Sequence, residues 1–308
     1  MDRRLTLAVG QLGPIAREEP RASVVRRLTA LLETAKARGA ALAVFPEMAL
    51  TTFFPRWHIT DEAELESFFE REMPNEATAP LFDAAARLGI GFYLGYCELI
   101  EGGNRKRRFN TSILVDATGR IIGKYRKIHV PGSDVNIPDL PFQHLEQMYF
   151  ETGDLGFPVF EAFGAKIGMA ICNDRRWPET YRVMAMQGAE VVVLGYNSPS
   201  QLPDWPEHNE LRAFHHLVCM QAAAYQNGIW VAASGKAGPE EGVDMLAHSC
   251  IIAPSGQVVA LTQGRGDELI MTDCDLAMSA AYKRFHDFDR NRKPEHYGPI
   301  LMPRPART

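Results

Sequence analysis

The stretch KIGMAICNDRRWPETYRVMAMQGAEVVVLGYN, residues 166–197, contains in succession the patterns of a strand, a helix and a second strand. Lys166–Ile171 is a short apolar run typical of a buried strand, and Pro178–Gln187 has helical spacing with a proline at its first position. After a glycine, the apolar run Glu190–Leu194 predicts another strand. This β-α-β order favours an α/β fold with parallel strands.

The first part of the chain contains the same series of patterns. Leu5–Gln11 predicts a strand, Ala22–Arg38 a helix that ends at a glycine, and Ala41–Phe45 a buried strand. Such units recur roughly 140 to 150 residues apart, which indicates an internal repeat; chance similarity between generic α/β units is the alternative. Further elements are expected at Ala79–Leu88 and Leu211–Gln226 (helices), Ile90–Glu98 and Ile229–Ala233 (strands), and Thr111–Val115 with Ile121–Tyr125 and His248–Ala253 with Gln257–Leu261 (hairpins).

The simplest architecture for these elements is a four-layer α-β-β-α sandwich of two mixed sheets with an internal pseudo-two-fold. No linker rich in Pro, Gly or Ser separates the two halves, so residues 1–284 are expected to form a single domain. The tail, residues 285–308, carries aromatic residues and prolines but no helical or strand period.

The composition narrows the classes of function. Of the 308 residues, 46% are hydrophobic and 23% charged, as in folded globular proteins. The net charge of −5, without a long basic run, makes nucleic acid and anionic membranes poor partners. The apolar run after the first residues is too short for a signal peptide, and the five cysteines form no C-x-x-C pair, so we expect reduced thiols in the cytoplasm. The nine histidines show no close ligand spacing, so no metal is expected.

Three side chains that suit catalysis follow predicted strands. The carboxyl ends of strands line the sites of open α/β sheets, and Glu47, Lys127 and Cys172 occupy such positions. Each has a structural alternative: a loop glutamate, a solvated hairpin lysine and a small core cysteine. Four polar residues, Asn173–Arg176, follow Cys172 and disfavour the core alternative. A thiol beside cations and a helix N-terminus, here marked by Pro178, is expected to have a lowered pKa.

Together, and in this order and at these separations, the three residues resemble the Glu-Lys-Cys triad of the nitrilase superfamily of carbon-nitrogen hydrolases. The resemblance covers nearly the whole chain. Within the superfamily, four segments are similar to the N-carbamoyl-D-amino acid amidohydrolases: Thr51–His58, Pro141–Glu146, Cys172–Glu179 and Phe214–Leu217.

The resemblance implies hydrolysis of the carbamoyl C–N bond of N-carbamoyl-D-amino acids through a cysteine thioester, without a metal or organic cofactor. Cys172 is then the nucleophile, and Lys127 with the backbone amide of Asn173 stabilises the oxyanion. Glu47 moves the protons. Glu146 resembles a second buried glutamate that holds the lysine, although a charge on a helix surface is the alternative.

The resemblance also assigns the substrate contacts. Arginine matches a carboxylate in a bidentate manner, so Arg175 and Arg176 are expected to bind the carboxylate of the substrate; surface pairing with Asp174 and Glu179 is the alternative. Asn197 matches a position that contacts the substrate. His129 and His144 match positions near the pocket that hydrogen-bond its loops.

Two segments depart from the carbamoylase pattern and flank the expected pocket, Ser133–Leu140 and Ser198–Leu202. They leave open another branch of the superfamily, an amidase, a β-ureido acid hydrolase or a nitrilase with the same triad. A catalytically silent scaffold protein is a further alternative. The resemblance implies a homo-oligomer, a dimer or tetramer, with the tail at the interface.

Overall fold

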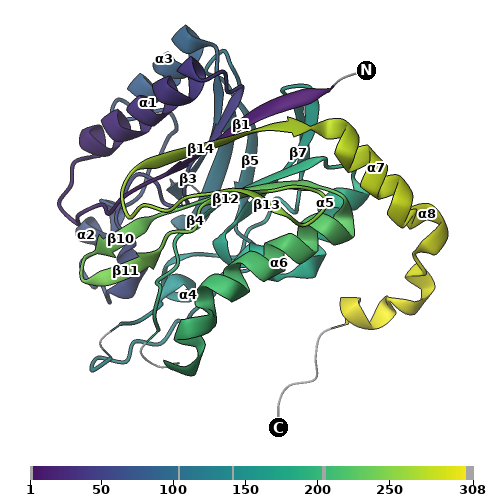
Figure 1. The fold of residues 1–308 in the computed structure, drawn as a ribbon. Coiled ribbons are helices and arrows are strands. Elements are labelled where there is room, and N and C mark those ends of the chain that lie inside the picture. Colours follow the sequence, from purple (N-terminus) through teal and green to yellow (C-terminus); the bar gives the residue numbers. More distant parts are fainter. Residues whose placement is uncertain (1–2, 103–104, 141, 203–205, 303–308) are drawn as a thin grey trace.

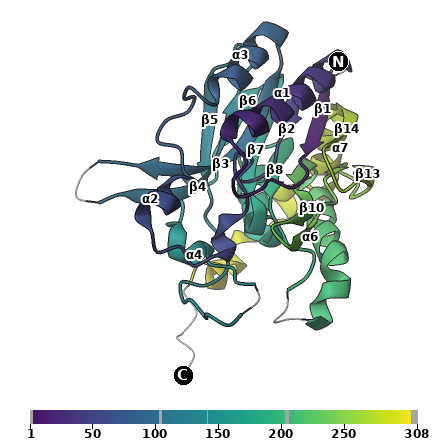
Figure 2. The ribbon, with the colours of Figure 1, turned by 90° about the vertical axis from the view of Figure 1, so that its left-hand side faces the viewer.

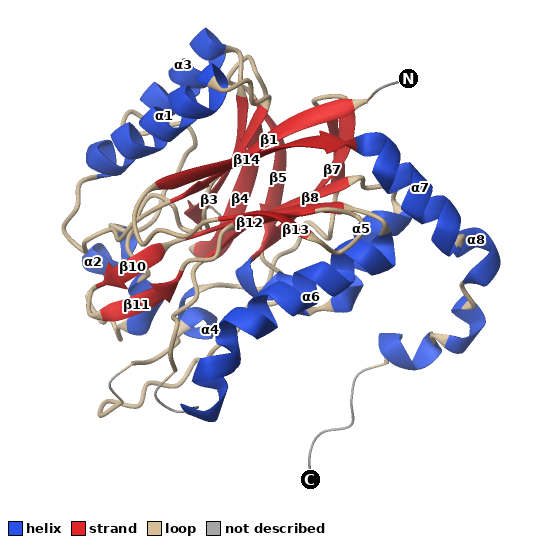
Figure 3. Cartoon of the chain, viewed as in Figure 1, coloured by secondary structure: helices blue, strands red, loops and turns tan. Residues whose placement is uncertain are grey.

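The computed structural model describes residues 3–102, 105–140, 142–202 and 206–302, and contains two six-stranded sheets packed face to face (Figure 1). Helices α1 (Arg21–Ala37) and α3 (Ala79–Leu88) lie side by side outside one sheet (Figures 1 and 2). Helices α5 (Pro178–Met186) and α6 (Arg212–Asn227) cover the other sheet (Figure 3). The predicted α-β-β-α sandwich is therefore confirmed.

The first sheet has the strand order β14-β1-β2-β3-β4-β5. Strands β1, β2 and β3 run parallel, whereas β4, β5 and β14 join them in antiparallel fashion. The bounds are β1 Arg4–Gln11, β2 Leu42–Val44, β3 Gly91–Ile100, β4 Arg107–Val115, β5 Ile121–Arg126 and β14 Glu268–Asp275.

The second sheet has the order β13-β12-β9-β8-β7-β6. Strands β7, β8 and β9 are parallel, and β12, β13 and β6 are antiparallel to their neighbours. The bounds are β6 Val159–Ala162, β7 Ala165–Ile171, β8 Val191–Tyr196, β9 Trp230–Gly235, β12 Cys250–Ile252 and β13 Val258–Leu261, with a separate hairpin of β10 Ala237–Glu240 and β11 Val243–Leu246.

The two sheets repeat one topology. Three parallel strands, two antiparallel hairpin strands and one antiparallel strand on the opposite edge occur in each, which confirms the internal repeat. Each sheet packs on both of its faces, as strand β1 shows. Leu7 and Val9 face the core between the sheets, whereas Ala8 faces α1 and α3. Residues from both sheets, among them Val44, Ile167 and Val193, fill the core between them.

The C-terminal part is more helical than its sequence indicates. Helix α7 spans Leu276–His286 and is followed by α8 (Phe288–Asn291) and by the 3-10 helices η4 (Pro294–His296) and η5 (Gly298–Leu301). The guanidinium of Arg182 on α5 lies 4.4 Å from the centre of the Phe288 ring. The final residues, 303–308, lie outside the described part of the chain. The absence of a period in the tail reflects these short turns.

The remaining helices are short: η1 Phe54–Arg56, α2 Glu62–Glu66, α4 Glu146–Tyr149, η2 Cys172–Arg176 and η3 Pro206–Leu211. Among the described residues, no helix combines the length and apolar character needed to cross a membrane.

Candidate active site

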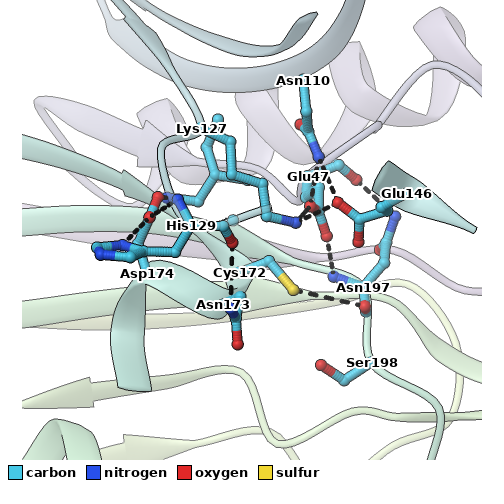
Figure 4. Close-up of polar contacts among 12 residues, drawn as sticks. Glu47, Asn110, Lys127, His129, Glu146, Cys172, Asn173, Asp174, Asn197 and Ser198 are labelled. Carbon is cyan, nitrogen blue, oxygen red and sulfur yellow. Dashed lines mark hydrogen bonds and ion pairs between the residues drawn. The ribbon is translucent and has the colours of Figure 1, made fainter. Parts of the chain in front are cut away.

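The ends of strands from both sheets bring the three predicted catalytic side chains together (Figure 4). Glu47 follows β2 by three residues, and Lys127 directly follows β5 of the same sheet. Cys172 directly follows β7 of the opposite sheet. The expectation that all three sit at strand ends is confirmed, and the site lies where the two sheets face each other.

A buried ion cluster forms the centre of the site. The Nζ of Lys127 lies 2.8 Å from Oε1 of Glu47 and 2.5 Å from Oε2 of Glu146, and none of the three side chains is exposed. Burial lowers the pKa of Lys127, but electrostatic interaction with the acidic groups of Cys172, Glu146 and Glu47 outweighs burial and raises that pKa above its usual value. Lys127 is therefore a permanent cation.

Glu146 is the partner that fixes this lysine. Burial raises the pKa of its carboxyl, but Lys127 and a hydrogen bond with His144 outweigh burial and hold that pKa well below its usual range. The Nε2 of His144 lies 2.7 Å from Oε1 of Glu146, and its ring packs edge-on against Phe53. Glu146 is thus buried in the ion cluster and not a helix surface charge, and His144 lies behind it.

Two asparagines hold the carboxylate of Glu47. The Nδ2 of Asn110 donates to Oε1 at 2.7 Å, and the backbone N–H of Asn197 donates to Oε2 at 2.7 Å. The Nδ2 of Asn197 also donates to the backbone oxygen of Glu47 at 2.8 Å. Asn110 was not predicted; its signal is the run of buried polar residues Asn110–Ser112 directly before the apolar end of strand β4, Ile113–Val115.

Glycines let the backbone of Glu47 enter between the sheets. A Cβ on Gly95 of β3 would lie 2.6 Å from the Cα of Glu47, and a Cβ on Gly195 of β8 would lie 2.3 Å from its nitrogen. Both approaches are too close for any side chain. The loop after β2 therefore depends on these two positions being glycine.

Cys172 has a backbone conformation that is uncommon for a residue with a side chain. Its φ is 47°, in the left-handed region, at the junction of β7 and η2. Its Sγ lies 3.7 Å from the backbone oxygen of Asn197 and 3.6 Å from Nη1 of Arg175. Strain of this kind concentrates at functional sites, where the surrounding structure imposes it.

The expected lowering of the pKa of this thiol is wrong. Burial, followed by the negative charge of Glu47, raises the pKa of Cys172 above its usual value, against Lys127 and Arg175. The residue begins a 3-10 helix, and α5 starts only at Pro178. The thiol is therefore protonated at neutral pH, and a base is needed to activate it.

Asp174 fixes the segment after Cys172 and was not predicted to do so. Its carboxylate accepts hydrogen bonds from the Tyr125 hydroxyl at 2.8 Å and from the backbone N–H of Ile171 at 2.9 Å. The Nδ1 of His129 lies 2.8 Å from the same carboxylate. The Nδ2 of Asn173 donates to the backbone oxygen of His129 at 3.1 Å. His129 thus supports the loop, and Asp174 is engaged away from both arginines.

The two adjacent arginines have different environments. Arg175 is 1% exposed and donates to the Cys172 backbone oxygen at 2.7 Å, to Ser198 Oγ at 3.0 Å and to His216 Nδ1 at 3.1 Å. Arg176 is exposed, and no described side chain forms an ion pair with it. The structure therefore gives Arg175 a bracing position beside Cys172 and leaves Arg176 open to an anion.

The site has the parts needed for attack on a carbonyl or nitrile carbon. It combines a thiol, a carboxylate that can take its proton, and a cation that can stabilise an oxyanion. Within the described ranges, no group of three or more His, Cys, Asp or Glu side chains is arranged to hold a metal ion.

Comparison with known proteins agrees with this arrangement. The family model for carbon-nitrogen hydrolases matches residues 6–284. An N-carbamoylputrescine amidase of Arabidopsis thaliana is 30% identical over 283 residues, which cover 88% of this chain and 87% of the relative. A solved carbon-nitrogen hydrolase from Helicobacter pylori G27 has a TM-score of 0.83 at 20% identity, covering 98% of this chain and 99% of its own. A Saccharomyces cerevisiae member of branch 10 of the nitrilase superfamily has a TM-score of 0.75 at 18% identity, covering 94% and 97%. The chain therefore belongs to the carbon-nitrogen hydrolases of the nitrilase superfamily, which act on C–N bonds.

Proposed function

We propose that the protein hydrolyses the carbamoyl C–N bond of N-carbamoyl-D-amino acids to the D-amino acid, ammonia and carbon dioxide. The observation that carries this proposal is the buried cluster of Glu47, Lys127 and Glu146 beside Cys172. Arg176, whose cation forms no ion pair with a described side chain, lies close by along the chain. The cluster supplies the chemistry, and the arginine supplies a partner for a substrate carboxylate.

In the first half of the reaction, the Sγ of Cys172 attacks the ureido carbon while Glu47 accepts the thiol proton. Lys127 and the backbone N–H of Asn173 stabilise the oxyanion of the tetrahedral intermediate. Glu47 then donates the proton to the departing nitrogen as the C–N bond breaks. The D-amino acid leaves, and the carbamoyl group remains on Cys172 as a thioester.

In the second half, water attacks the thioester and Glu47 accepts its proton. The C–S bond breaks, the sulfur regains a proton, and carbamate leaves and decomposes to ammonia and carbon dioxide. Lys127 keeps the same role in both halves, because Glu146 holds it charged and in place. The hydrogen bonds from Asn110 and Asn197 keep the Glu47 carboxylate oriented throughout.

Selectivity for the D form requires three points of attachment. Arg176 binds the carboxylate, Cys172 holds the ureido carbon, and Asn197 binds the ureido group. The Oδ1 of Asn197 supports the last contact, because it is buried and has no hydrogen-bond partner among the described residues. A ureido N–H would satisfy it.

The carboxylate contact gives a direct test of substrate class. Arg176→Ala is expected to lower kcat/KM by at least about tenfold for N-carbamoyl-D-amino acids, since a charge-assisted bidentate pair is lost. A decarboxylated carbamoyl compound should be a poor substrate and should be little affected by the substitution. The measurement is ammonia release from matched D, L and decarboxylated compounds, with Arg120→Ala, on the exposed β4–β5 turn, as the control. Equal kcat/KM for all three compounds would reject the carboxylate contact.

A second candidate is hydrolysis of N-carbamoylputrescine, favoured by the name of the Arabidopsis relative. That compound ends in a primary amine, which is a cation at neutral pH. Cations beside Cys172, including Arg175 and Arg176, disfavour such a substrate, so we place it second. The test adds N-carbamoylputrescine and a simple amide to the same panel of compounds. A preference for either of them would reverse the order of the two candidate functions.

We also propose that the protein is a homo-oligomer. Apolar side chains on the outer faces of α5 and α6 are exposed, at 43% for Val183, 43% for Met186 and 60% for Phe214. The C-terminal segment beyond α7 adds exposed Ile300 and Leu301. Exposed apolar side chains in this number support self-association through a two-fold interface.

This proposal predicts that a charge placed on the outer face of α5 weakens self-association. Val183→Glu should weaken self-association by about tenfold or more, because an unpaired carboxylate would enter an apolar interface. Analytical ultracentrifugation checks this, and Val259→Glu, at a similarly exposed valine on β13, is the control. A wild-type protein that sediments as a stable, active monomer would contradict the proposal.

A further inference from the structure

A third arginine lies beside the site, and neither the sequence pattern nor the proposed mechanism uses it. Arg212 is the first residue of α6 and is half-buried. Its Nε donates to the backbone oxygen of Pro199 at 2.9 Å, and no described group accepts a hydrogen bond from its two terminal nitrogens. The two terminal nitrogens of the guanidinium are therefore available to bind a carboxylate in a bidentate manner.

Contacts of neighbouring residues place Arg212 next to Arg175. Arg175 binds Ser198 and Arg212 binds Pro199, so two consecutive loop residues hold two guanidinium groups. Arg212 also lies one helical turn before His216, whose Nδ1 accepts from Arg175. With Arg176, this makes a cluster of three arginines around the segment that begins with Cys172.

None of the three arginines forms an ion pair with a described side chain. Two carboxylates, Glu210 and Asp244, line the same hollow as Arg212, and Asp244 is paired with Arg265. Burial, followed by the positive charges of Arg176 and Arg175, lowers the pKa of Arg212 to about 10, still well above neutral. Three cations held close together, none of them in an ion pair with a described acid, form a site for an anion.

The space beside Arg212 fits the side chain of a substrate. A hollow of about 450 Å³ lies at the start of α6. Arg212 lines it together with the uncharged polar side chains Ser200, Gln201 and Asn209, and the charged residues Glu210, Asp244 and Arg265 also line it. Ser200 and Gln201 belong to the loop that departs from the carbamoylase pattern, and Asn209 belongs to η3. The hollow thus combines room, hydrogen-bonding groups, two arginines and two carboxylates, of which Asp244 is already paired with Arg265.

We propose that Arg212, with Arg176, binds a second acidic group carried by the substrate side chain, so that the preferred substrates are carbamoyl derivatives of acidic amino acids. This inference rests on the proposed function and specifies its substrate. It directs the substrate side chain toward the start of α6, beside Ser198–Leu202, one of the two segments that the sequence places next to the pocket. Arg176 bridges the two carboxylates, and Arg175 braces Cys172.

The kinetic test compares N-carbamoyl-D-glutamate with N-carbamoyl-D-glutamine, an isostere whose side chain is neutral and which keeps the α-carboxylate. The wild type should hydrolyse the dianion with a kcat/KM at least about tenfold higher than the monoanion, because a charge-assisted pair to arginine is lost in the isostere. Arg212→Gln should abolish that preference and leave the kcat/KM for N-carbamoyl-D-glutamine within about threefold of the wild-type value. Arg87→Gln, which removes an exposed arginine paired with Glu33 on the far side of the first sheet, should keep the preference. An unchanged preference in Arg212→Gln, or an equal loss for both substrates, would overturn the inference.

A binding test separates this inference from the proposed function. In a Cys172→Ala background, N-carbamoyl-D-glutamate should raise the melting temperature more than N-carbamoyl-D-glutamine, and Arg212→Gln should remove the difference. If the wild type hydrolyses neither compound, the proposed function fails. The anion site is then tested only by the difference in melting temperature between the two compounds, and equal stabilisation by both compounds refutes it.

Discussion

Replacing Cys172 with alanine should lower kcat by at least about 10⁴-fold and leave the fold and the oligomer intact, because the nucleophile of a covalent mechanism has no substitute. The thiol is buried at the junction of β7 and η2, where a methyl group fits the same space. Cys172→Ser should be nearly as inactive, since a hydroxyl of similar size is a much weaker nucleophile at this position.

The measurement is steady-state ammonia release, together with the melting temperature and sedimentation of each variant. Cys274→Ala is the matched control, because Cys274 is also a buried cysteine but lies within β14 of the first sheet. The Cys274→Ala variant should keep wild-type turnover, even where its melting temperature is lower. Activity of Cys172→Ala within tenfold of the wild type would end the proposed mechanism.

Most of the fold was predictable because its strands are buried and continuous. The runs at Leu5–Gln11 and Lys166–Ile171 each lie inside a sheet with a strand on both sides, so their composition alone predicts strands. Strand β14 was not predicted. It is an edge strand with partly exposed side chains, and its partner β1 lies at the other end of the chain, where Arg4 pairs with Asp275. Local patterns carry no information about such a pairing.

The candidate site was predictable in its members but not in their contacts. Residue type and strand-end position select Glu47, Lys127 and Cys172, because these depend on local sequence. The bracing role of Arg175 and the contact of Asn197 with Glu47 depend on side chains that meet only in the folded protein. The pKa of Cys172 was mispredicted for the same reason, since burial between two sheets outweighs any local cation.

Glu47→Gln is expected to lower kcat by about 10³-fold or more, because the amide cannot take the proton of Cys172. The isosteric side chain fits the same space, and its single amide oxygen can still accept a hydrogen bond from Asn110 or from the backbone N–H of Asn197, so the site should remain folded. Glu33→Gln, a change to an exposed carboxylate on α1, is the control and should leave turnover unchanged.

The pH dependence of the Glu47→Gln variant separates a proton carrier from a structural role. Without a base, only thiol that is already ionised can attack, and burial, the larger cause of the raised pKa of Cys172, persists in the variant. Below that pKa the thiolate fraction grows about tenfold per pH unit, so the residual rate should climb steeply from neutral to alkaline pH. In the wild type, the Glu47 carboxylate removes the proton during attack, and the rate should not follow thiol ionisation. A residual rate that is flat across this range, or near-normal turnover at neutral pH, would show that Glu47 is not the base.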